Sequence, residues 1–139
     1  MYSRPENLDL DRQLLNDIRC AALKGGAKKL YIFDARSKTA ARWNYWVHSG
    51  GWEDETWWDC ELQFCDIGNI DYVAAWFNQM CAVAAPYTRQ AYEATGYLQC
   101  LSLLLRTSVQ IAARLEGGDN VLVHCTHGWD RTSQLCSLV

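Results

Sequence analysis

The segment from Val121 to Thr132 constrains the fold of this chain more than any other. Its sequence is Val-Leu-Val-His-Cys-Thr-His-Gly-Trp-Asp-Arg-Thr. The apolar residues at its start predict the end of a buried strand, and the apolar spacing in residues 132–139 predicts the start of a helix. A strand followed by a tight loop and a helix directs backbone N–H groups toward an anion. The segment therefore predicts a phosphate-binding loop between a sheet and a helix.

Cys125 and Arg131 lie in this loop, with five residues between them. A phosphate monoester carries about two negative charges at neutral pH, which repel an attacking thiolate. Backbone amides and the Arg131 guanidinium can neutralise those charges and bind the oxygens in pairs. The same positive field would lower the pKa of the Cys125 thiol from its free value of about 8.5. The spacing therefore predicts a nucleophile and a phosphate-binding cation in one loop.

Three neighbours of this pair have predicted roles. Gly128 permits a left-handed turn and a close approach of the backbone. The Thr132 hydroxyl can donate to the thiolate or cap the helix. Asp130 is the nearest carboxylate that could protonate a leaving oxygen. Because a Cys and an Arg at this spacing are weak evidence alone, a buried structural cysteine in a strand-to-helix turn is the alternative.

The complete loop is more specific than its Cys and Arg. It resembles the signature of the myotubularins, phosphoinositide 3-phosphatases of the Cys-based phosphatase superfamily, which is His-Cys-Ser-Asp-Gly-Trp-Asp-Arg-Thr followed by Ser or Ala and then Gln. The matching positions are His124, Cys125, Gly128, Trp129, Asp130, Arg131, Thr132, Ser133 and Gln134. Thr126 is a mild departure, whereas His127 replaces an acidic residue of the family.

A second match begins at the end of a predicted strand. The family has Asp-Ala/Cys-Arg-Pro there, followed by paired Asn and Ala residues and by glycines that end near a Glu. The matching positions are Asp34, Ala35, Arg36, Ala41, Asn44, Gly50, Gly51 and Glu53. Ser37 stands for the family Pro, and Ala40 stands for an Asn that faces the substrate. The alternative for Asp34 and Arg36 is a structural ion pair at a strand end.

A third match is the segment 66–70, Asp-Ile-Gly-Asn-Ile, which resembles the family's Asp-Ile-x-Asn-Ile. The resemblance places Asn69 at the substrate pocket, together with Ile70. Asn69 also directly precedes an amphipathic run, which predicts a helix N-cap. Both roles are compatible, because a helix N-terminus is itself an anion site.

Hydrophobic periodicity predicts the order of the other elements. The expected helices are 7–24, closed by Gly25-Gly26, a run after Asn69 that ends at Pro86, and 90–115, and the expected strands are 29–33, 62–67 and 121–124. This alternation predicts an α/β fold with a mainly parallel sheet flanked by helices. The resemblance implies a partial Cys-based, protein-tyrosine-phosphatase-like fold. Residues 1–139 would be the N-terminal part of a phosphatase domain, ending just after the signature loop.

Composition restricts the classes of function. Half of the residues are hydrophobic and 21% are charged, which is typical of a globular domain. The net charge of −3 argues against a general affinity for nucleic acid or anionic membrane. Seven cysteines without a CxxC pair favour a reducing compartment over a disulfide framework or zinc site. No apolar run approaches the roughly 20 residues of a transmembrane helix, and no secretory signal is evident.

The resemblance implies a two-step hydrolysis of phosphatidylinositol 3-phosphate, with the 3,5-bisphosphate as a further candidate. Cys125 would attack the 3-phosphate, Arg131 would bind its oxygens, and Asp130 would protonate the inositol oxygen and later activate water. The implied substrate-binding residues are Thr126, His127, Gly128, Trp129, Thr132, Asn69 and Ile70. No metal or cofactor is expected. The implied setting is the cytoplasm, with peripheral attachment to endosomal membranes and assembly with family members as further expectations.

Two alternative functions stay open. One is a protein tyrosine or dual-specificity phosphatase, which phosphopeptides would reveal by outcompeting lipids as substrates. The other is a catalytically weak or inactive adaptor that binds an active family member. The intact Cys125, Asp130 and Arg131 argue against an adaptor. The departures at Ala40 and His127, and the short helix after the loop, argue for it.

Overall fold

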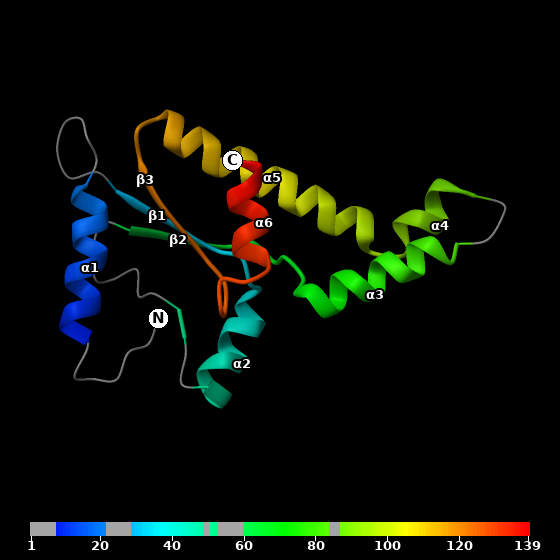
Figure 1. The fold of residues 1–139 in the computed structure, drawn as a ribbon, viewed down its shortest axis with the longest axis horizontal. Coiled ribbons are helices and arrows are strands. Elements are labelled where there is room, and N and C mark those ends of the chain that lie inside the picture. Colours follow the sequence, from blue (N-terminus) through cyan, green and yellow to red (C-terminus); the bar gives the residue numbers. More distant parts are fainter. Residues whose placement is uncertain (1–7, 22–28, 49–50, 53–59, 84–86) are drawn as a thin grey trace.

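The computed structural model describes residues 8–21, 29–48, 51–52, 60–83 and 87–139 (Figure 1). Within these residues, three parallel strands form a sheet of order β2-β1-β3. They are β1 (Leu30–Asp34), β2 (Cys60–Phe64) and β3 (Asn120–His124). In the register, Ile32 lies opposite both Leu62 and Leu122. The predicted α/β fold with a parallel sheet flanked by helices is confirmed.

The central strand β1 is the most apolar of the three. Leu30, Ile32 and Phe33 are almost fully buried, as expected for a strand that is paired on both sides and covered on both faces. The observed strand β2 ends at Phe64, before the predicted end at residue 67, because residues 65–69 leave the sheet. Cys65 and Ile67 nevertheless donate backbone hydrogen bonds to Asp34 and Ala35, so this loop follows the end of β1 closely.

Six helices occur in the described residues. Their bounds are α1 (Leu8–Cys20), α2 (Lys38–His48), α3 (Ile70–Cys81), α4 (Arg89–Glu93), α5 (Tyr97–Glu116) and α6 (Arg131–Leu138). The hydrophobic pattern did not predict α2, and Gly25-Gly26 and Pro86 lie outside the described residues. The single helix predicted at 90–115 is wrong, because Gly96 has a left-handed φ of 79° and separates α4 from α5.

The core lies on the face of the sheet that α5 and α6 cover. Both helices pack against β3 and against each other, while α3 and α4 pack on the N-terminal half of α5, away from β3 (Figure 1). The buried core residues are Phe33, Ala35, Cys65, Ile67, Cys100, Leu104, Ile111, Cys125 and Leu135. Cys125 and Leu135 belong to this core, so both ends of the predicted loop region are anchored in the hydrophobic core.

The inward face of α5 is only partly the one that hydrophobic spacing predicts, which includes Leu104, Leu105 and Val109. Leu104 is buried together with Cys100 and Ile111, whereas Leu105 and Val109 are exposed. Both faces of α5 are apolar, so periodicity alone did not identify the face that meets the sheet. Despite this apolar surface, no described helix is both long enough and apolar enough to cross a membrane.

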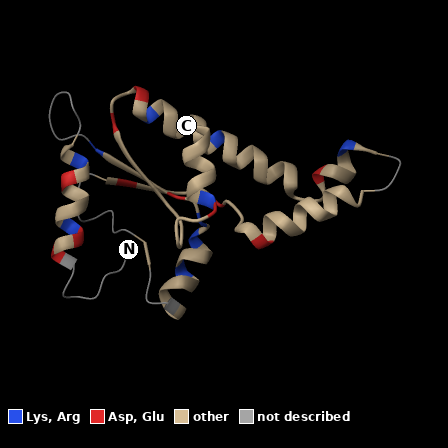
Figure 2. Cartoon of the chain, viewed as in Figure 1, with Lys and Arg blue, Asp and Glu red and all other residues tan. Residues whose placement is uncertain are grey.

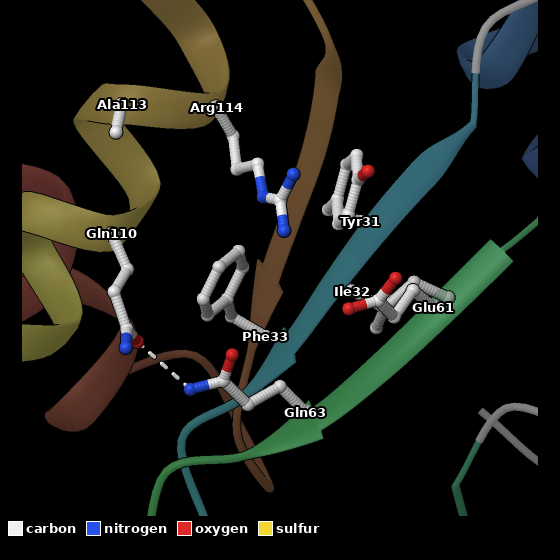
Figure 3. A pocket seen from close by; sticks show the side chains of 8 residues that line it. All are labelled: Tyr31, Ile32, Phe33, Glu61, Gln63, Gln110, Ala113 and Arg114. Carbon is white, nitrogen blue, oxygen red and sulfur yellow. Dashed lines mark hydrogen bonds between the residues drawn. The ribbon is translucent and has the colours of Figure 1, made fainter.

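A pocket of about 270 Å³ lies between α5 and the strands β1 and β2 (Figure 3). The guanidinium of Arg114 lies 3.8 Å from the centre of the Tyr31 ring at one end. At the other end, the Gln63 amide donates a hydrogen bond of 2.9 Å to Gln110 (Figure 3). No residue of the loop at 125–132 lines this pocket. It belongs to the packing between helix and sheet and is distinct from the predicted phosphate site.

Candidate active site at the loop after β3

Cys125 directly follows β3, and only 7% of the residue is exposed. Its sulfur accepts a hydrogen bond of 3.3 Å from the backbone N–H of Gly128. The chain turns back toward the sulfur because Gly128 has a left-handed φ of 78°. Residues other than glycine rarely adopt this backbone conformation. The loop therefore surrounds the sulfur with backbone donors, as the sequence predicted for a phosphate-binding loop.

The pKa of the Cys125 thiol is lowered from its ordinary value. Burial raises this pKa, but hydrogen bonds from the Thr132 side chain and from the backbone of Thr132, Gly128 and His127 outweigh that effect. Among the described residues, no oxygen or nitrogen atom is a hydrogen-bond partner of the buried Thr132 hydroxyl, so the sulfur is the acceptor left to it. This environment therefore favours the thiolate of Cys125, which is the nucleophilic form of a cysteine.

Arg131 begins α6, and its side chain is about nine-tenths buried. Its Nη2 donates to the Thr126 hydroxyl at 3.5 Å. Its Nε has no hydrogen-bond partner within the described residues and lies 3.7 Å from Asp130 Oδ1. A buried guanidinium with a donor still available is suited to bind a planar or tetrahedral anion through two oxygens.

Asp130 lies between the sulfur and a second helix. Its Oδ2 accepts a hydrogen bond of 3.1 Å from the Ile70 N–H, and its Oδ1 lies 3.7 Å from Cys125 Sγ. Burial raises the pKa of Asp130. The backbone N–H and the positive charge of Arg131, together with the Ile70 N–H, lower this pKa by more, so it lies below its ordinary value. The carboxylate is therefore ionised at neutral pH, and an approaching phosphate dianion would favour its protonation.

Asn69 and Ile70 reach the site in different ways. The Asn69 side chain accepts a hydrogen bond of 3.1 Å from the Tyr72 N–H, so it is the N-cap of α3, as its sequence position predicted. Ile70 contacts the loop through its backbone N–H, while its side chain is exposed. The first turn of α3 therefore adds one amide donor to the site.

The Asn44 side chain is a contact that hydrophobic patterning missed. It extends from α2 and donates a hydrogen bond of 3.0 Å to the Thr126 hydroxyl. Its agreement with the family sequence was the only available signal. Asn44 and Arg131 thus both donate to the Thr126 hydroxyl. The departure at Ser37 also has a structural role, because its hydroxyl accepts a hydrogen bond of 3.1 Å from the Ala40 N–H and caps the start of α2.

Asp34 and Arg36 form the structural ion pair that the sequence left as an alternative. Arg36 Nη2 lies 2.6 Å from Asp34 Oδ2, and both side chains are buried. The same Nη2 donates to the Gly51 carbonyl at 2.8 Å. His124 Nε2 lies 3.9 Å from Asp34 Oδ2. The pair therefore lies close to the side chain of His124, the residue that precedes Cys125.

His127 and Trp129 form a separate part of the loop. Their rings stack with centroids 5.2 Å apart and an angle of 30° between the planes. Trp129 is 84% exposed, and His127 is also exposed. A direct role for these two side chains in substrate binding stays a prediction. Across the described ranges, no group of three or more His, Cys, Asp or Glu side chains is arranged to hold a metal ion.

Comparison with known proteins places these features in a family. A family model for the myotubularin-like phosphatase domain matches residues 4–139. The human phosphatidylinositol-3,5-bisphosphate 3-phosphatase MTMR4 is 38% identical over 128 residues, which cover 86% of this chain and 11% of that protein. Myotubularin from Xenopus laevis is 34% identical over 135 residues, covering 92% of this chain and 22% of the relative. This chain thus corresponds to a small part of each relative.

Proposed function

Since this chain belongs to the myotubularin-like phosphatase family, we propose that it forms the N-terminal part of a phosphoinositide 3-phosphatase domain, ending just after the loop that carries the nucleophile. The observation that supports this most is the position of Cys125. Its sulfur is hydrogen-bonded by a loop amide, its pKa is lowered, and the buried guanidinium of Arg131 belongs to the same loop. A thiolate and a phosphate-binding cation in one loop are the groups that phosphoryl transfer to sulfur requires.

The proposed substrate is phosphatidylinositol 3-phosphate, with the 3,5-bisphosphate as a second substrate. The name of one relative, a phosphatidylinositol-3,5-bisphosphate 3-phosphatase, supports a lipid with a phosphate at the 3-position. We further propose action at the cytoplasmic surface of endosomal membranes and assembly with other family members. Thr126, His127, Gly128, Trp129, Thr132, Asn69 and Ile70 would contribute to substrate binding.

In the first step, the Cys125 thiolate attacks phosphorus and forms an S–P bond while the P–O bond to inositol breaks. The loop amides and Arg131 bind the phosphoryl oxygens as negative charge accumulates on them. Asp130, protonated in the presence of the phosphate, donates its proton to the departing inositol oxygen. Its Oδ1 lies 3.7 Å from Cys125 Sγ, and this proximity supports the proposed role of Asp130 as the acid.

In the second step, water attacks the phosphocysteine. Asp130, now ionised, accepts a proton from the water while the water oxygen bonds to phosphorus. The S–P bond breaks, inorganic phosphate leaves and the Cys125 thiolate is regenerated. The lowered pKa of Asp130 suits this step, because a general base must be ionised. The Ile70 N–H keeps the carboxylate in position through both steps.

The test is phosphate release by the 139-residue chain from short-chain phosphatidylinositol 3-phosphate, the 3,5-bisphosphate and a phosphotyrosine peptide. We expect release from the lipids and little from the peptide. Cys125→Ser should abolish turnover, because a serine hydroxyl stays protonated where a thiol ionises. Preference for the peptide would favour a protein phosphatase. A folded chain that binds the lipids without turnover would favour the adaptor.

A further inference from the structure

The helix α2 combines exposed tryptophans with positive charge. Trp43 is 67% exposed and Trp46 is 80% exposed. Lys38 and Arg42 are also exposed, and the helix contains no Asp or Glu (Figure 2). Large aromatic side chains this exposed are uncommon on a surface that faces only water, and grouped ones mark an interaction site.

These side chains share one face of α2. Lys38, Arg42 and Trp46 recur every fourth residue and form one row along the helix, and Trp43 adjoins Trp46 three positions earlier. The buried side of the helix is different, because Ala41 is fully buried and Asn44 donates to Thr126 in the loop. The helix is therefore attached to the loop by one face and presents the other outward.

We propose that the outer face of α2, defined by Lys38, Arg42, Trp43 and Trp46, binds the interfacial region of an anionic lipid bilayer. Tryptophan favours this region because its ring is apolar while its N–H still reaches water. Lysine and arginine can extend their charged ends to lipid phosphates while their stems cover apolar surface. The partner fits the substrate of the proposed function, although binding itself requires no turnover.

The charge distribution favours a bilayer over a general attraction to anions. The chain has a net charge of −3, which predicts no overall affinity for an anionic surface. The outer face of α2 is a local exception to this net charge. Helices that lie on membranes typically combine tryptophan with lysine and arginine, as this face does.

Docking of α2 would also bring the loop to its substrate. The bond between Asn44 and Thr126 joins the helix to the loop that contains Cys125. In the same loop, Trp129 is 84% exposed. Binding through α2 would therefore hold the thiolate near the level at which lipid phosphates lie. The expected kinetic result is a lower KM for substrate in vesicles, with no effect on a soluble short-chain substrate.

The test is sedimentation of the full chain with phosphatidylcholine vesicles, with and without phosphatidylserine and without any phosphoinositide. We expect binding mainly to the vesicles that contain phosphatidylserine. The double variant Trp43→Ala/Trp46→Ala should bind roughly tenfold more weakly, because two rings no longer enter the interface. Arg42→Gln should weaken binding about fivefold and reduce its dependence on salt. The matched control is Leu105→Ala/Val109→Ala, which shortens exposed apolar residues of α5 and should bind as the unsubstituted chain does.

Further experiments separate membrane docking through α2 from loss of catalysis, unfolding and self-association. Cys125→Ser should bind vesicles normally, so loss of catalysis and loss of docking are distinguishable. Trp46→Ala alone, at the more exposed tryptophan, tests the surface if the double variant unfolds. Equal binding of Trp46→Ala and the unsubstituted chain would overturn the proposal. The proposal would also be overturned if the chain self-associated in ultracentrifugation through Trp43 and Trp46, while vesicle binding did not depend on these two residues.

Discussion

The carboxylate of Asp130 accepts a hydrogen bond of 3.1 Å from the backbone N–H of Ile70, which lies 60 residues earlier in the chain. Asp130 directly precedes α6, yet this bond is to the first residue of α3. The N-terminus of a helix carries a partial positive charge, which an ionised carboxylate stabilises. The bond therefore joins the loop to a second helix and fixes the carboxylate beside Cys125.

Asp130→Asn should slow the hydrolysis of phosphoinositide far more than that of an activated aryl phosphate. The amide can still accept the Ile70 N–H, so the loop is retained, but it cannot donate a proton to the leaving oxygen. An aryl leaving group needs no such proton. The measurement is kcat on both substrates for the variant and the unsubstituted chain. Equal losses on the two substrates would remove Asp130 from the role of acid.

Cys125 should react with iodoacetamide at a lower pH than an ordinary thiol. Its pKa is lowered despite burial, so the thiolate forms below the free value of about 8.5. Thr132→Ala should move the midpoint of the reaction to higher pH, because one donor to the sulfur is lost, while Thr132→Ser should restore it.

Mass spectrometry of the modified peptides measures this midpoint for each cysteine. Cys65 is an internal control, because burial and the nearby Asp34 raise its pKa to about 12. It should stay unmodified over the range in which Cys125 reacts. A midpoint for Cys125 that is unchanged in Thr132→Ala would contradict the role of the hydroxyl.

Arg36→Met should lower the free energy of unfolding by about 3–5 kcal/mol, because it leaves the buried carboxylate of Asp34 without its partner. The matched control is Arg89→Met, which removes an exposed pair with Glu93 and should leave the free energy of unfolding nearly unchanged. Denaturant unfolding of both variants measures the difference. Similar small losses in both would mean that the Asp34–Arg36 pair does not stabilise the strand end.

Gly68→Ala should destabilise the chain by about 1–3 kcal/mol through overlap with a ring. A Cβ atom at Gly68 would lie 2.6 Å from the Trp76 ring, which also packs against Gly96. Trp76→Leu should recover part of this loss in the double variant, since the shorter side chain leaves room for the methyl group. Thermal unfolding of the two single variants and the double variant measures the coupling. Strictly additive losses would show that the two residues do not compete for the same space.

The sequence alone determined the features that depend on neighbouring residues. Cys125, Gly128 and Arg131 are close in the chain, so the geometry of a strand, a tight turn and a helix was enough to predict that they share one loop. The apolar run of β1 likewise predicted a strand, and the position of Asn69 predicted its cap on α3. Local conformation restricts such features before any long-range contact forms.

The tertiary structure decided which distant segments meet. Nothing in the local pattern paired Asp130 with Ile70 or Asn44 with Thr126, because each pair joins elements far apart in sequence. It also decided which face of α5 is buried. Both faces are apolar, and Leu104 rather than Leu105 is buried because its face is the one that meets the core. Periodicity identifies an apolar face, but only the packing partner selects between two of them.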